Sequence, residues 1–351
     1  MRNKKFLAFI LAAALAFQAL AGCGGSGDKA ETKAPTEAAK EETKAAAGET
    51  SGQEKKEATG LKVYQISVMS GGAAWGQDEK GFNEACAELG WEGQYLAPSA
   101  ANTASDMVNL TETAITNGAD IIMPCVIDPD TFADVLDRAK ERGIVVIGLA
   151  AGDPDRCDAM IGTDPVDLGR NAAEALVKAV AEDEEINVCT MQTLLTNTGQ
   201  NDQRQAFEER LKELRPDANI VSYEECDSSA TKAADKLSAL YLAHPELNGV
   251  VSFDSYAGLG GAAFVEEKSL QDSFHVIGID DAPEILRAIQ NGTMDCTVAQ
   301  MWHDIGYQSC YLAKTIYEGG DYEYDNGIGT SIIFAEDVDN WVETYGIDMS
   351  E

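Results

Sequence analysis

From Leu61 onward the sequence alternates short apolar runs with amphipathic segments, and this alternation restricts the fold more than any other feature. The runs at residues 63–68, 121–123 and 144–149 have the length and composition of buried strands, with helical spacing of apolar residues between them. After Gly162 the pattern starts again, with a helix expected at 168–180 and four more strands. These strands are expected at residues 186–191, 220–223, 250–253 and 276–279. The two series predict an α/β protein of two doubly wound parallel-sheet lobes.

Acidic residues greatly outnumber basic residues in the chain from Leu61 onward. Residues 61–351 hold 17 of the 26 Lys and Arg but 52 of the 60 Asp and Glu. A body this acidic repels phosphate groups, so nucleic-acid binding is not expected and a neutral or cationic ligand is favoured.

The amino terminus has the features of an export signal. Arg2, Lys4 and Lys5 precede an apolar run at 6–21, and Leu20–Cys23 resembles a bacterial lipobox. This resemblance implies a signal peptide at 1–22 and lipid on Cys23, which would anchor the protein to the extracytoplasmic side of the cell membrane. Residues 23–60 lack aromatic and branched aliphatic residues after the lipobox and are predicted to be a disordered tether.

Two polar residues directly follow apolar runs of the second series. Asp280 comes after residues 276–279, and Gln300 after 297–299. Side chains just past the carboxyl ends of parallel strands face the crevice where ligands bind. Asp281 is expected to cap the helix that begins near Pro283, which leaves Asp280 without a structural role. Asp280 and Gln300 are therefore predicted to form two walls of one ligand crevice.

Five stretches together carry a family resemblance that covers the chain from Leu61 onward. They are Gly72–Gly76, Ala243–Leu247, Val251–Asp254, Gly278–Asp280 and Ala299–Gln300. In this order they resemble the type I periplasmic sugar-binding proteins of the ribose and galactose binding group, which are solute-binding components of ABC importers. The resemblance implies two lobes joined by a three-strand hinge. The implied lobes are residues 61–163 with 301–330, and 164–300 with 331–351.

The resemblance also assigns roles to individual residues. Trp75 matches an aromatic residue that stacks on the apolar face of a sugar ring, which suits the flat surface of an indole. Asp254, Asp280 and Gln300 match positions that hydrogen-bond sugar hydroxyls. Two structural alternatives stay open, namely a core position for Trp75 and a helix N-cap for Asp254.

The chain departs from the family at two places that contact the ligand. Ala150 and Ala151 stand where the family has an Asp followed by an Arg. Arg204 is offset by one residue from a second family Arg, so Asn201 and Gln203 join it as candidate contacts. These changes leave open a less common sugar, a polyol or a nucleoside as the ligand.

The remaining motifs predict a monomeric, non-enzymatic binding protein without cofactor or metal. The glycine-rich segment at 258–263 lies four residues past its strand, too far for a dinucleotide fingerprint, and the acidic segment at 321–325 lacks the Gly and Glu of a calcium loop. The expected partners are a small neutral polar ligand and an ABC permease. A role beside a membrane sensor uses the same binding chemistry and stays open. A transcription regulator of the lac repressor type would need a basic DNA-binding segment.

Seven cysteines follow Cys23, and their arrangement is informative. Their number is odd and no CxxC pair occurs, which argues against both a disulfide framework and a zinc site. Most of them lie among apolar residues. They are predicted to be buried free thiols.

Overall fold

The computed structural model describes residues 57–71 and 73–350, which belong to one compact unit, Gly52–Glu351. The predicted signal peptide, the lipidation of Cys23 and most of the predicted tether lie outside the described residues. Among the residues that are described, no helix combines the length and apolar content needed to cross a membrane.

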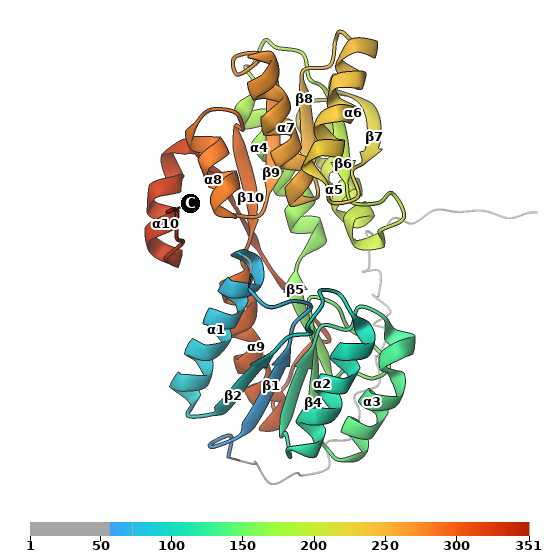
Figure 1. Ribbon diagram of the computed structural model, residues 1–351, viewed down its shortest axis with the longest axis vertical. Helices are drawn as coiled ribbons and strands as arrows, with labels where there is room; N and C mark the ends of the chain where they lie inside the picture. The colour runs from blue at the N-terminus through green and yellow to red at the C-terminus, as the bar shows by residue number, and fades with distance from the viewer. Residues whose placement is uncertain (1–56, 72, 351) are drawn as a thin grey trace, which may run out of the picture. The chain divides into compact units, whose positions relative to one another are not determined.

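The first lobe contains a six-stranded sheet in the order β11-β5-β4-β3-β1-β2, and all its neighbouring strands are parallel (Figure 1). Its strands are β1 (Lys62–Ile66), β2 (Glu92–Leu96), β3 (Ile121–Pro124), β4 (Val145–Leu149), β5 (Ala159–Thr163) and β11 (Asp325–Ile328). Its helices are α1 (Ala73–Leu89), α2 (Ala104–Thr116), α3 (Pro129–Glu141) and α9 (Trp302–Tyr317).

The second lobe contains a sheet in the order β12-β10-β9-β8-β6-β7, which is parallel except for the antiparallel pair of β10 and β12. Its strands are β6 (Asn187–Gln192), β7 (Asn219–Glu225), β8 (Gly249–Ser252), β9 (His275–Ile279), β10 (Cys296–Gln300) and β12 (Thr330–Phe334). Its helices are α4 (Pro165–Ala179), α5 (Thr198–Leu214), α6 (Ala230–Ala243), α7 (Ser255–Lys268), α8 (Pro283–Gln290) and α10 (Val338–Tyr345), with a short 3₁₀ turn at Ala335–Asp337.

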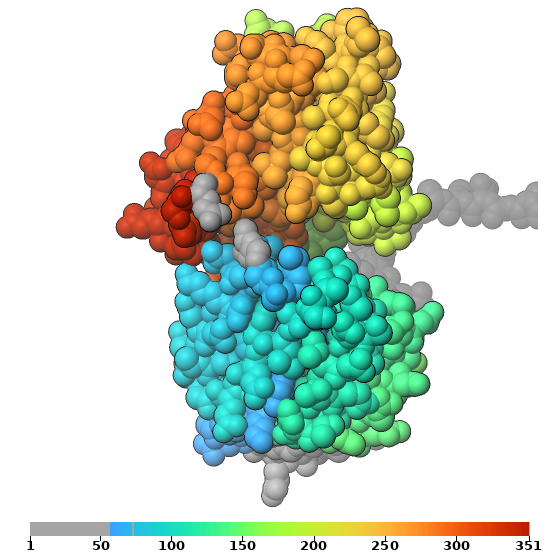
Figure 2. Space-filling view, viewed as in Figure 1, coloured from blue at the N-terminus to red at the C-terminus, as the bar shows by residue number. Residues whose placement is uncertain are grey.

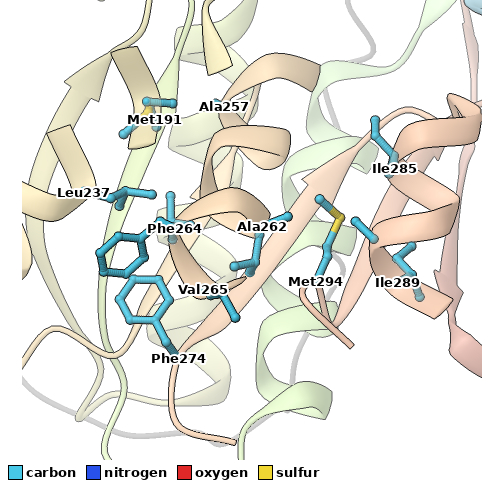
Figure 3. Packing of buried hydrophobic residues seen from close by; sticks show 14 of the residues in the cluster. Met191, Leu237, Ala257, Ala262, Phe264, Val265, Phe274, Ile285, Ile289 and Met294 are labelled. Carbon is cyan, nitrogen blue, oxygen red and sulfur yellow. The ribbon is translucent and has the colours of Figure 1, made fainter. Parts of the chain in front are cut away.

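Both sheets are buried on both faces, as parallel sheets usually are. In β1 the side chain of Val63 packs with α1 and α9, and the next residue, Tyr64, packs with α2 and α3 on the other face. In the second lobe Val188 belongs to the cluster with α4 and α5, whereas Met191 packs with α6 and α7. Figure 3 shows this last cluster, in which Phe264 and Phe274 pack edge to face with their ring centroids 5.0 Å apart.

The chain passes between the two sheets three times, at Asp164, Met301 and Gly329. The prediction of two doubly wound parallel-sheet lobes is therefore confirmed. The elements that were not predicted from the sequence include strands β5 and β11 and helices α2, α6 and α10.

All seven cysteines in the described part of the chain are unpaired and buried, as predicted. Burial raises the pKa of Cys125 and Cys189 to about 12, and that of Cys157 and Cys226 to about 11. Because the thiolate is the reactive form of cysteine, these side chains are held in their unreactive form.

Helices α1 and α9 are in direct backbone contact through two glycines. A Cβ atom added to Gly81 would lie 2.0 Å from the carbonyl oxygen of His303, and one added to Gly306 would lie 2.1 Å from that of Asp78. Neither position has room for a side chain. This contact fixes α1, which carries Trp75, against the rest of the first lobe.

A buried polar network also holds α1 in place. Asp78 is fully buried, and its Oδ2 accepts hydrogen bonds from Gln65 Nε2 at 2.6 Å and Tyr95 Oη at 2.9 Å. The Tyr95 hydroxyl also lies 3.2 Å from the carbonyl oxygen of Trp75. Burial raises the pKa of Asp78 to about 7, because a carboxylate loses its hydration there and no cation replaces it.

We predict that Gly306→Ala lowers the stability of the protein by about 1–3 kcal/mol, since the new methyl group forces α1 and α9 apart. The matched control is Gly76→Ala in α1, where an added Cβ has no atom within 4 Å. This control should be neutral or stabilising by up to about 1 kcal/mol. Thermal unfolding of both variants checks the prediction, and an unchanged midpoint for Gly306→Ala would contradict it.

A second prediction concerns Asp78. Because its folded pKa lies above its unfolded value, the folded state binds more protons between about pH 4 and pH 7, so stability falls as the pH rises through that window. The loss is at most about 4 kcal/mol. Asp78→Asn cannot ionise and should show a smaller drop in unfolding midpoint between pH 5 and pH 8 than the parent protein. Equal drops in both proteins would mean that another group causes the pH dependence.

Candidate functional site

Asp280 stands at the end of β9 in an unusual backbone conformation. Its φ angle is +70°, a left-handed conformation that is uncommon for a residue other than glycine. Two hydrogen bonds to β10 hold it there, one from the Asp280 amide to the Val298 carbonyl oxygen at 3.1 Å and one from Thr297 Oγ1 to the Asp280 carbonyl oxygen at 2.7 Å. Such strain is typical of functional positions, where the surrounding structure keeps it in place.

The carboxylate of Asp280 is the centre of a hydrogen-bond network. Its Oδ1 accepts from Gln300 Nε2 at 2.7 Å and from Trp302 Nε1 at 3.4 Å, and its Oδ2 accepts from Ser255 Oγ. Gln300 in turn accepts from Thr163 Oγ1 at 2.8 Å. Burial raises the pKa of Asp280 above its usual value, while the three hydrogen bonds act in the opposite direction. The structure thus gives Asp280 several structural partners, which the sequence analysis did not foresee.

These groups border a polar cavity of about 220 Å³ at the carboxyl ends of β8, β9 and β10. The cavity includes four of the seven residues predicted to bind ligand. Its walls are formed by Gln200, Gln203, Phe253, Asp254, Ser255, Ile279, Asp280 and Gln300.

Asp254 both caps a helix and borders the cavity. Its Oδ1 accepts from the amide of Ala257 at 3.0 Å, which makes it the N-cap of α7. Its Oδ2 accepts from Thr193 Oγ1 at 2.6 Å and Ser228 Oγ at 2.7 Å. The structural alternative left open for Asp254 is therefore realised, and its position on the cavity wall is retained as well.

The three candidates on α5 are placed differently from one another. Gln203 borders the cavity, and its Oε1 is buried without a hydrogen-bond partner. Asn201 instead bonds within its own lobe, donating from Nδ2 to the Leu195 carbonyl oxygen at 3.0 Å. Arg204 does not border the cavity, and its NH1 lies 2.7 Å from Glu208 Oε1 and its guanidinium 4.8 Å from the centre of the Tyr223 ring.

Trp75 is half-buried in the first turn of α1 and does not border the cavity. Its ring centroid lies 4.9 Å from that of Trp302, at an interplanar angle of 45°. Because Trp302 also bonds Asp280, the two indoles connect the first lobe to the carboxylate of the second. Trp302, Gln200 and Ser255 were not recognised from the sequence. A signal for Trp302 was its position two residues after Gln300, just past the crossing between lobes.

The predicted helix cap at Asp281 is wrong. Ala282 is the N-cap residue of α8 and no side chain bonds the first turn. Asp281 Oδ2 instead accepts from Trp341 Nε1 of α10 at 2.9 Å. Burial raises its pKa to about 6. The carboxylate borders a second cavity of about 240 Å³, together with Gln77, Asp348 and neighbouring residues.

A third cavity, of about 430 Å³, lies beside Ala150, the residue that follows β4. Its walls include Ala150, Gly162, Asp164, Asp325 and Gly327. Within residues 57–71 and 73–350, no group of three or more His, Cys, Asp or Glu is placed to hold a metal ion.

Comparisons with known proteins match this architecture. The family described as periplasmic binding protein domain matches residues 64–321. A ribose import binding protein of Salmonella typhimurium is 22% identical over 225 residues, which cover 63% of this chain and 73% of that protein. A xylitol-binding protein of Mycolicibacterium smegmatis is 22% identical over 304 residues, covering 86% of this chain and 84% of that protein.

Solved structures share the fold. The crystal structure of a sugar-binding protein of a sugar ABC transporter from Bacillus halodurans aligns with a TM-score of 0.74 and 22% identity, covering 80% of this chain and 99% of that chain. The family match extends over more than half of the sequence. The chain therefore belongs to the periplasmic binding protein domain family, whose members are substrate-binding proteins rather than enzymes.

Proposed function

We propose that this protein is the extracytoplasmic solute-binding component of an ABC importer and captures a sugar or a related polyol. The observation that carries this proposal is the hydrogen-bonded group of Asp280, Gln300 and Ser255 on the wall of a polar cavity at the strand ends. Carboxylate and amide groups in this arrangement can accept from and donate to ligand hydroxyls. The names of the ribose and xylitol relatives support this class of ligand.

Capture would use both lobes. Asp280 belongs to the second lobe, whereas Trp75 belongs to the first and packs against Trp302, which itself bonds Asp280. A ligand held between the lobes would bury its hydroxyls against Asp280 and its apolar C–H face against an indole. Hinged closure of two lobes around a ligand is a common motion in binding proteins.

A screen of sugars, polyols and nucleosides by thermal shift tests the proposal, because a ligand that binds only the folded protein raises its unfolding temperature. With the best ligand, Asp280→Ala should weaken binding roughly tenfold to a hundredfold in calorimetric titration, since a charge-assisted hydrogen bond is lost. The control Asp272→Ala, at an exposed position of the same lobe, should keep full affinity. If no compound in the screen stabilises the protein, or if Asp280→Ala binds normally, this function or this site is wrong.

We further propose that Cys23 carries lipid and anchors the protein to the membrane, on the basis of the Leu20–Cys23 sequence. Cys23→Ala removes the thiol that would be acylated and should move the protein from the membrane fraction to the soluble fraction. Immunoblots of fractionated cells measure this. A variant that remains with the membranes would contradict lipidation at this residue.

A further inference from the structure

The cavity beside Asp280 contains two carboxylates and no cationic residue. Asp254 is only 8% exposed, and Asp280 lies on the same cavity wall. The other two cavities described above are also bordered by acidic residues. Asp281 and Asp348 border the cavity of about 240 Å³, and Asp164 and Asp325 border the cavity of about 430 Å³. No Lys, Arg or His is among the described residues that border these three cavities.

The arginines on α5 and on the segment after β4 form ion pairs with carboxylates, although the buried Nε of Arg204 has no hydrogen-bond partner. Arg204 of α5 is bonded to Glu208 and lies over the Tyr223 ring. On the segment after β4, Arg156 is 2.9 Å from Asp153 and 3.0 Å from Asp137. The positions directly after β4 are Ala150 and Ala151. The described residues that border the cavity therefore supply no counter-charge to it.

Neutral donors alone satisfy the two carboxylates. Asp254 accepts from Thr193, Ser228 and the Ala257 amide, and Asp280 accepts from Ser255, Gln300 and Trp302. These bonds bring no positive charge to either carboxylate. Burial, with a smaller effect of the nearby Asp254, raises the pKa of Asp280 although its three hydrogen bonds lower it, so burial adds a free-energy cost to the ionised form. A positive charge on a bound ligand would relieve this cost.

One residue that borders the cavity, Gln203, has an acceptor atom without a hydrogen-bond donor. The Oε1 of Gln203 is buried and has no partner, although its residue borders the cavity. An ammonium group has three donors and no acceptor, so it suits a cavity wall that includes Asp254, Asp280 and Gln203. A metal ion is a poorer candidate, because no metal-binding cluster occurs in the described part of the chain.

We propose that the ligand is cationic, an amino sugar or amino polyol whose protonated amine binds beside Asp254 and Asp280. The inference rests on the proposed function and narrows its ligand class. The amine supplies the positive charge that the cavity walls lack. It also has three N–H donors for the acceptors on the wall, whereas a neutral hydroxyl has one donor. Anionic sugars are excluded from the site, because they would add a third negative charge.

Calorimetric titration of the purified protein with matched pairs tests the proposal. The pairs are D-glucosamine with D-glucose, D-galactosamine with D-galactose, and 1-amino-1-deoxysorbitol with sorbitol, together with N-acetylglucosamine and glucuronate. At least one amine should bind tenfold or more tightly than its hydroxyl counterpart, and N-acetylation should remove this advantage. Neutral sugars that bind as tightly as their amines overturn the inference and leave the proposed function standing. If no sugar, polyol or amine binds, both are wrong.

Two variants test whether the carboxylates of Asp254 and Asp280 cause the preference for amines over neutral sugars. Asp254→Asn keeps a side chain that can cap α7, and Asp280→Asn keeps a residue that tolerates the left-handed backbone, so both variants should fold. Each should reduce the ratio of amine to neutral affinity at least tenfold. Asp235→Asn removes one negative charge from an exposed position on α6 of the same lobe and should leave the ratio unchanged. A ratio that survives in both cavity variants, or that falls equally in the Asp235 control, would overturn the assignment.

Discussion

The hydrogen bond between Asp280 and Gln300 is the interaction on which the site depends. It joins the ends of two neighbouring parallel strands, and Trp302 and Thr163 extend it to the first lobe. Asp280 can make it only because β10 holds its backbone at a positive φ. With an ordinary extended backbone, the carboxylate at this position would point in another direction. The positive φ of Asp280 therefore accounts for both the backbone strain and the geometry of the site.

The first lobe contributes rigidity rather than charge. Helix α1 is fixed by the glycine contacts with α9 and by the buried Asp78, so the backbone of Trp75 has little freedom. The second lobe contributes all the polar residues that are described on the cavity wall. This division suits a binding protein in which a stiff apolar surface of one lobe meets a hydrogen-bonding surface of the other.

Features that depend on residues close together in the sequence could be predicted, whereas those that depend on distant residues could not. Asp280 and Gln300 could be placed together because parallel strands end at one edge of a sheet. The role of Asp281 was misassigned because its partner, Trp341, is 60 residues away in the sequence. Strand β11 has the sequence Asp-Asn-Gly-Ile, without the pattern of a buried strand, and it is formed by pairing with β5 far earlier in the chain. Trp302 and Ser255 stand at helix starts, where tertiary packing rather than periodicity decides the direction of a side chain.

The burial of the thiols makes their oxidation depend on whether the protein has folded. The seven unpaired cysteines of the described residues are vulnerable to oxidation only while the cores are open, because folding removes each of these sulfurs from contact with oxidants. In an oxidising compartment, the yield of folded protein then depends on whether the hydrophobic cores form faster than non-native disulfides. Refolding yield should depend on added reductant, whereas the folded protein should be indifferent to it.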